Sequence, residues 1–226
     1  MRNTILTILV LIASLTISKA QTKLEEVKIG NQIWTSNNLD VFGFNNGDAI
    51  PQATSADEWS RAANNGTPAW CYYNFDASNR EKYGKLYNWH AVMDERGLAP
   101  EGWHIPSFEE WQTLVKSVGG ELAKSSWADN KEAAKKLKST SGWFDVYTEK
   151  YRNGSNESGF NATAGGLAIN SGSKVRFINL NNNGFFWTSS TFSSVLSRIV
   201  RIDAQHSLSG ISGDKGNGLS VRLVKD

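Results

Sequence analysis

The chain has 226 residues, of which 24 are basic and 22 acidic, and its net charge of +2 gives no support to a nucleic-acid partner. Its 39% of apolar residues is enough for one substantial core. Nine Trp and 20 Gly predict large flat side chains in that core and many turns around it. The single cysteine, Cys71, excludes an internal disulfide, so stability must come from packing.

The first residues are typical of an export signal. Arg2 supplies a small positive region, residues 5–17 are apolar, and Ser18-Lys19-Ala20 is a small-x-small cleavage site. The apolar run is shorter than the roughly 20 residues of a membrane-spanning helix, so we expect cleavage rather than a retained anchor. Cleavage would remove Arg2 and Lys19 and leave equal numbers of basic and acidic residues.

The rest of the chain shows no long linker. We therefore predict a signal peptide at residues 1–20 and a single domain at residues 21–226. No later stretch is apolar enough to span a membrane, so we expect an exported protein without a membrane span after cleavage. The periplasm, the outer cell surface and the extracellular medium all remain open as its location.

A hairpin and a helix open the domain. Two short apolar runs flank a Gly-Asn pair, which predicts a hairpin over residues 27–34. Ser55 and Glu58 have the spacing of a capping box, in which two side chains each satisfy a backbone N–H at the helix start. This pair predicts a helix from Ser55 to Ala63.

A strand and a further helical pattern follow. Residues 69–75 are rich in aromatic side chains and predict a strand, in which Cys71 is a buried and inert thiol. From Lys85 to Met93 the apolar residues share one helical face, which predicts a helix there. His90 lies on that face, so we expect a packed or half-buried ring rather than a catalytic one.

The strongest helix signal lies in the middle of the chain. Ser107 and Glu110 form a second capping box, and a Gly-Gly pair at 119–120 ends the helix. Its apolar stripe consists of Trp111, Leu114, Val115 and Val118. A shorter helix is predicted over residues 131–138. Its lysines form a solvated face: Lys131, Lys135, Lys136 and Lys138.

From Ser139 onward the chain is rich in Gly, Asn, Ser and aromatic residues and lacks helical periodicity. Strands are predicted at residues 167–170, 175–178, 185–190, 197–202 and 219–224. In the last of these, Leu219, Val221 and Leu223 alternate with Ser220 and Arg222. Early helices and late short antiparallel strands predict an α+β fold with long polar loops.

Several motifs occur in one order along nearly the whole mature chain. They lie at residues 27–34, 71–74, 83–89, 98–106, 158–160, 186–190 and 220–226. With these motifs the chain resembles the Fibrobacter succinogenes major paralogous domain family, found in exported proteins of Bacteroidetes, Fibrobacteres and their relatives. Members of that family commonly carry a cysteine where this chain has Leu223, so Cys71 lacks a possible partner here.

The resemblance implies a C-type-lectin-like fold, with two main helices, short antiparallel sheets and long polar loops. It implies an exported or surface-associated binding role and supplies no catalytic residues. Residues 106–111 and 186–190 are also similar to the formylglycine-generating-enzyme branch of that superfamily. The copper-dependent oxidases of that branch need a pair of cysteines, which the single Cys71 cannot provide.

A few residues could form a metal or catalytic site. Asn179 to Asn183, Asp203 and Asp214 could supply oxygen ligands to a weak calcium site, but Asn-rich loops are typical of simple turns. His206 near Asp203 is the one suggestive acid–base pair, and no nucleophile motif accompanies it. We therefore expect no metal, no cofactor and no catalytic residues.

Aromatic residues set among Asn and Ser remain as candidate ligand contacts. Flat rings flanked by hydrogen-bonding groups stack on sugars or anchor protein interfaces, although each ring could instead pack beneath a loop. The candidates are Trp143, Tyr147, Tyr151, Phe192 and His206. We expect an exported, non-catalytic binding module for a glycan or a cell-surface protein. The alternatives are a structural subunit of a surface assembly and an enzyme on a formylglycine-generating-enzyme-like scaffold.

Overall fold

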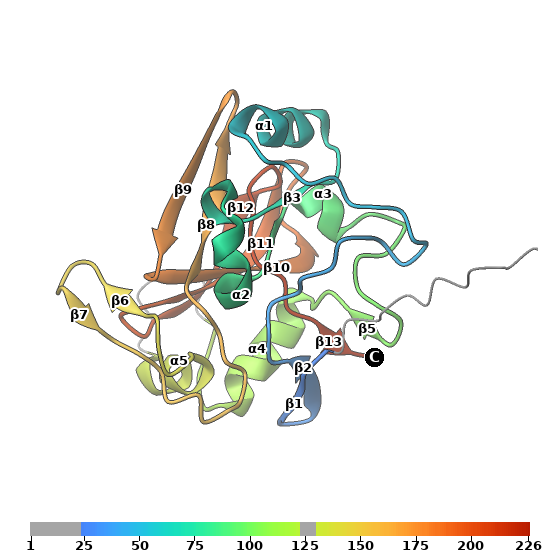
Figure 1. Ribbon diagram of the computed structural model, residues 1–226. Helices are drawn as coiled ribbons and strands as arrows, with labels where there is room; N and C mark the ends of the chain where they lie inside the picture. Colours follow the sequence, from blue (N-terminus) through green and yellow to red (C-terminus); the bar gives the residue numbers. More distant parts are fainter. Residues whose placement is uncertain (1–23, 123–129) are drawn as a thin grey trace, which may run out of the picture.

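A computed structural model describes residues 24–122 and 130–226, drawn in colour in Figure 1. The expected signal peptide at residues 1–20 lies outside the described residues. None of the helices in the described ranges is both long enough and apolar enough to cross a membrane. The architecture is α+β, with strands predominating over a few short helices.

A four-stranded sheet joins the two ends of the described chain. Its order is β1 (Glu26–Ile29), β2 (Gln32–Thr35), β13 (Val224–Lys225) and β5 (Trp103–His104). The predicted hairpin is confirmed, because Ile29 pairs with Gln32 and leaves only Gly30 and Asn31 in the turn. Gly30 has φ 61°, a left-handed conformation that glycine adopts without steric cost.

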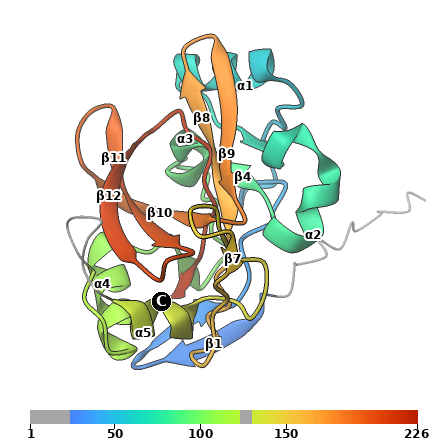
Figure 2. The same cartoon turned by 90° about the vertical axis from the view of Figure 1, so that its left-hand side faces the viewer.

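The larger sheet has five strands, which are drawn in orange to red in Figure 2. Its order is β12 (Leu208–Asp214), β11 (Leu196–Asp203), β10 (Asn183–Thr191), β8 (Gly165–Ser171) and β9 (Lys174–Leu180). All pairs are antiparallel except β8 with β10. Four of these strands were predicted. β12 was missed because its Ser and Gly residues hide the apolar alternation on which a strand prediction depends.

Both principal helices begin where their capping residues predict. α4 (Phe108–Ser117) has a complete capping box, in which Glu110 accepts a hydrogen bond from Ser107 N at 2.7 Å. In α1 (Ala56–Asn65), Ser55 caps the backbone of Glu58, but the Glu58 carboxylate reaches back to Thr54 N at 2.7 Å instead. The shorter helix predicted over residues 131–138 corresponds to α5 (Lys131–Leu137).

The prediction of one helix over residues 85–93 is wrong. Two residues form β4 (Leu86–Tyr87), which pairs with β3 (Trp70–Cys71), and only α3 (Trp89–Val92) is helical. The cause is Asn88, whose side chain accepts hydrogen bonds from Ala69 N at 3.1 Å and Ala91 N at 2.9 Å. Asn88 therefore both follows the end of β4 and caps the start of α3.

The strand predicted over residues 69–75 is also shorter than expected. After β3 the chain turns through η1 (Tyr73–Phe75) and η2 (Ala77–Asn79) into α2 (Arg80–Tyr83). Asn74 has φ 55°, which breaks the extended backbone. Cys71 is buried as predicted, and burial raises the pKa of its thiol.

The core is centred on the apolar stripe of α4. Trp111 is completely buried and packs edge-on against Trp34, with ring centroids 5.0 Å apart. Phe160 and Phe186 lie on its other sides, at 5.5 and 5.3 Å. Aromatic side chains from three distant segments therefore meet at one helix, which ties the two large sheets together.

The strand predicted over residues 219–224 is wrong, because only Val224–Lys225 at its end form a strand, and its alternation does not separate buried from exposed residues. Ser220 and Arg222 are as buried as the apolar residues between them. The segment runs through the interior, where Leu219 bridges to Tyr87 and Ser220 to Phe186. With protein on both faces, alternation cannot mark an inside and an outside.

Candidate functional site

The candidate site is a cleft of about 400 Å³, which we call the Tyr147 cleft. Its lining residues are Tyr147, Asn179, Asn182, Asn183, Arg201, Asp203 and Gln205. All seven come from the region after Ser139. This volume is within the range of small-molecule sites.

The floor of the Tyr147 cleft comes from neighbouring strands of the large sheet. Asn183 begins β10 and pairs with Asp203 at the end of β11. Arg201 lies two residues earlier on the same face of β11, with its Nη2 3.8 Å from Asp203 Oδ2. Arg201 Nε is buried and has no hydrogen-bond partner among the described residues. The guanidinium is thus only partly engaged by the protein.

Three amide side chains, near the end of β9, in the β9–β10 turn and at the start of β10, form a polar wall. Asn182 and Asn183 are 9% and 6% exposed, whereas Asn179 is open to solvent. Across residues 24–122 and 130–226, none of the three amides is engaged in a side-chain hydrogen bond. Their donors and acceptors are therefore free to meet a ligand.

The opposite wall is the hairpin of β6 (Phe144–Asp145) and β7 (Lys150–Tyr151), whose loop carries Tyr147. The Asp145 carboxylate is buried and accepts hydrogen bonds from Tyr147 N at 3.0 Å and Thr148 Oγ1 at 2.7 Å. Arg152 Nε adds an ion pair at 3.0 Å. Burial raises the pKa of Asp145, but these hydrogen bonds outweigh burial and lower it overall. The loop is thus held in place while the Tyr147 ring remains 80% exposed.

Lys138 lies behind the cleft and corrects the prediction of a fully solvated lysine face. Its side chain is buried, and Nζ donates to the carbonyl oxygens of Arg152, Asp203 and Ala204 at 2.6, 3.1 and 3.1 Å. The ammonium also lies 4.5 Å from the Trp143 ring centroid. Burial lowers the pKa of Lys138 to about 7. Lys138 therefore joins the hairpin to the β11–β12 turn.

Two of the predicted ligand contacts belong to this buried cluster instead. Trp143 is completely buried, which corrects its assignment as a surface ring. His206 is half-buried, and its Nδ1 lies 3.2 Å from Lys138 Nζ. Burial and the charge of Lys138 lower the pKa of His206 to about 4, so the ring is neutral and accepts this hydrogen bond. Neither ring lines the cleft.

The other predicted contacts are exposed but dispersed. Tyr151 is 73% exposed and packs edge-on against Phe144 on the hairpin beside the cleft. Phe192 is 55% exposed, but it follows the far end of β10. At about 3.3 Å per strand residue, the chain between Asn183 and Phe192 spans up to about 30 Å. Only Tyr147 of the five candidates lines the cleft.

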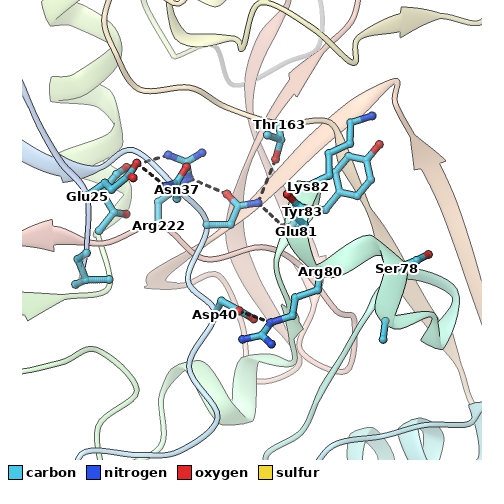
Figure 3. Close-up of a pocket in the computed structure, with 14 residues that line it drawn as sticks. Glu25, Asn37, Asp40, Ser78, Arg80, Glu81, Lys82, Tyr83, Thr163 and Arg222 are labelled. Carbon is cyan, nitrogen blue, oxygen red and sulfur yellow. Dashed lines mark hydrogen bonds and ion pairs between the residues drawn. The ribbon is translucent and has the colours of Figure 1, made fainter. Parts of the chain in front are cut away.

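A second cleft, of about 660 Å³, lies on the other side of the β9–β10 turn. We call it the Arg222 cleft (Figure 3). Its polar lining includes Asn37, Asn38, Asp40, Ser78, Arg80, Glu81, Lys82, Tyr83, Thr163 and Arg222. Arg80 Nε and Asp40 Oδ2 are 2.7 Å apart and point toward one another in Figure 3. Sequence patterns did not indicate this cleft.

Arg222 lines this cleft, and its side chain is completely buried. Its guanidinium donates to Asn38 Oδ1 at 2.7 Å and to the carbonyl oxygens of Thr35, Phe160 and Asn161 at 2.9, 2.6 and 2.9 Å. No carboxylate in the described residues forms an ion pair with it, and burial lowers its pKa to about 9. Arg222 therefore joins three segments through neutral acceptors.

The described residues contain no group of three or more His, Cys, Asp or Glu side chains arranged to hold a metal ion. Asp203 accepts a hydrogen bond from Ser207 N at 2.9 Å, and Asp214 accepts one from Gly216 N at 2.7 Å at the far end of β12. These two carboxylates therefore shape separate turns rather than one oxygen-rich site.

Comparison with protein families gives one match over the domain that contains both clefts. Residues 27–225 match the Fibrobacter succinogenes major domain family. The chain belongs to this family. The matched range of the Fibrobacter succinogenes major domain includes every residue that lines the Tyr147 cleft. Comparisons with curated proteins and with solved structures give no match.

Proposed function

We propose that this chain is an exported, non-catalytic module that binds a glycan in the Tyr147 cleft. The observation that carries the proposal is an exposed tyrosine ring opposite three unengaged amides. A sugar ring presents apolar C–H faces and many hydroxyl groups, so it suits a flat ring beside amide donors and acceptors. Arg201 and Asp203 supply charged donors and acceptors to the same cleft.

The arrangement supports binding more than turnover. His206, the candidate general base, is hydrogen-bonded to Lys138 and does not line the cleft, so it is not placed to take a proton from a ligand there. The two ten-residue helices, short sheets and long polar loops support the C-type-lectin-like placement as part of this proposal. We propose export from the signal-like sequence at residues 1–20, with the periplasm, the outer surface or the medium as the destination.

A structural role in a surface assembly is the second candidate. The side chains of Val146, Tyr147 and Tyr151 on the β6–β7 hairpin are 52, 80 and 73% exposed, respectively. Exposed apolar side chains clustered on one hairpin are typical of protein contacts. Sedimentation of residues 21–226 tests this: self-association that is lost in Val146→Ser would favour assembly over glycan binding.

Affinity electrophoresis of residues 21–226 through gels containing xylan, mannan, β-glucan or polygalacturonate tests the glycan proposal. We expect retardation by at least one polymer, and Tyr147→Ala should weaken it about tenfold because the stacking ring is lost. Phe192→Ala is the matched control, an exposed ring outside the cleft. Retardation by none of the polymers, or a loss with Phe192→Ala rather than Tyr147→Ala, would overturn the proposal.

A further inference from the structure

We propose that the Tyr147 cleft and the Arg222 cleft are two subsites of one surface that binds a linear glycan chain. This inference rests on the proposed function and specifies its ligand as a chain longer than a disaccharide. The two clefts lie on either side of a single turn between β9 and β10. A ligand that fills only one of them would leave the other polar surface unused.

Asn181 connects the two clefts through its contacts, although it lines neither of them. Its Oδ1 accepts hydrogen bonds from Tyr83 Oη at 2.6 Å and Lys82 Nζ at 3.3 Å, and both of these residues line the Arg222 cleft. Its neighbours Asn179 and Asn182 line the Tyr147 cleft. One turn therefore contributes to the wall of the Tyr147 cleft and is hydrogen-bonded to two residues that line the Arg222 cleft.

The backbone of Asn181 is fixed on both sides. Asn181 N donates to Ala164 O at 2.8 Å, and Asn181 O accepts from Phe144 N at 2.6 Å, at the base of the Tyr147 hairpin. Asn181 has φ 61°, a left-handed conformation that asparagine tolerates better than most residues. The two subsites thus have a set relative position before any ligand arrives.

Lys82 gives a second connection between the clefts. A Cβ placed on Gly142, just before the hairpin, would lie 3.2 Å from Lys82 Cε. The lysine stem from the Arg222 cleft therefore reaches the start of the hairpin that carries Tyr147. Figure 2 shows α2 and the β6–β7 hairpin on the same face of the molecule, which lets one chain contact both.

The Arg222 cleft offers groups suited to sugar hydroxyls. Arg80 uses Nε for Asp40, and its guanidinium lies 4.9 Å from the centroid of the Phe42 ring. Both terminal nitrogens are without a hydrogen-bond partner in the described residues. Ser78 and Glu81 are exposed at the rim. The Ser78 side chain forms a hydrogen bond with Asp76, whereas no hydrogen bond from the described residues engages the Glu81 carboxylate. Hydroxyl, carboxylate and guanidinium groups together match the donors and acceptors of neutral sugar units.

Calorimetry with oligosaccharides of increasing length tests the inference. The probes are xylo-, manno-, cello- and galacturono-oligosaccharides, from the disaccharide upward, matched to the polymer that retards the protein. We expect the affinity to rise at least about tenfold with length and then level off when both subsites are filled. An affinity that does not change with length would overturn the inference and leave the proposed function standing.

Variants separate the two subsites. Arg80→Ala and Ser78→Trp, the second of which blocks the cleft at an exposed position, should abolish the rise with length and leave the disaccharide affinity unchanged. Tyr147→Ala should weaken every length, and Arg61→Ala on α1 is the matched arginine control. Retention of the rise in both Arg222-cleft variants would overturn the inference. Failure of all the oligosaccharides and their polymers to bind would instead overturn the proposed function.

Discussion

Lys138 Nζ donates a hydrogen bond to His206 Nδ1 over 3.2 Å, although the two residues are 68 positions apart in the chain. The ammonium also donates to the carbonyl oxygens of Arg152, Asp203 and Ala204. These contacts join the end of α5, the strand that closes the Tyr147 hairpin and the turn that carries Gln205. Lys138 is therefore a positioning residue for the walls of the Tyr147 cleft.

Lys138→Met should lower the free energy of unfolding by about 3 kcal/mol, because three buried carbonyl oxygens lose their donor. Urea unfolding followed by tryptophan fluorescence measures the change. Lys135→Met is the matched control on the exposed side of the same helix and should stay within about 0.5 kcal/mol of the parent. Equal effects from both variants would show that the buried hydrogen bonds of Lys138 contribute little.

Asp145→Ala should weaken glycan binding by about tenfold or more while the protein remains folded. The substitution removes the acceptor for Tyr147 N, Thr148 Oγ1 and Arg152 Nε, so the loop loses the contacts that hold its tyrosine. Hydrogen exchange should show faster exchange confined to the hairpin. Asp57→Ala, at an exposed position of α1, provides the control. Unchanged binding in Asp145→Ala would contradict the positioning role.

His104 should make stability depend on pH. Partial burial lowers its pKa, but hydrogen bonds to Glu110 at 2.8 Å and Asp226 at 2.6 Å outweigh burial and place the pKa above 6.5. A pKa that is higher in the folded state contributes stability below pH 6.5, and this contribution is lost as pH rises through the folded value.

The urea midpoint of the parent should therefore fall more than that of His104→Gln between about pH 6 and 8. Comparing the two proteins removes the contributions of other titrating groups. His104→Gln should bind glycan as the parent does, because His104 lines neither cleft. Parallel pH curves for the two proteins would contradict the proposed ion pairs.

Trp111→Ala should cost about 3 to 5 kcal/mol and unfold much of the domain, because it leaves a large cavity at the centre of the core. The indole contacts Trp34, Phe160 and Phe186 and is completely buried. Thermal unfolding followed by circular dichroism measures the loss. Trp103→Ala, at a half-buried position of β5, should be much milder. A near-parental melting temperature for Trp111→Ala would contradict the central place given to this ring.

Local signals predicted the elements whose starts depend on neighbouring residues. The hairpin at residues 27–34 and the starts of α1 and α4 follow from turn and capping chemistry within a few positions. The segment at residues 85–93 was misread because its helical periodicity competed with pairing between β3 and β4. That pairing involves residues outside any local window.

The sequence by itself determined the family, the α+β class and the capped helices, and it pointed to the region after Ser139, which carries the exposed rings of Tyr147, Tyr151 and Phe192. Only the tertiary structure decided which of those residues share a cleft. It placed Trp143 inside, turned His206 toward Lys138, and separated Phe192 from Tyr147. The physical reason is that burial depends on what packs against a side chain from distant parts of the chain. Lys138 and Arg222 are polar in sequence and yet buried, because distant carbonyl oxygens accept their hydrogen bonds.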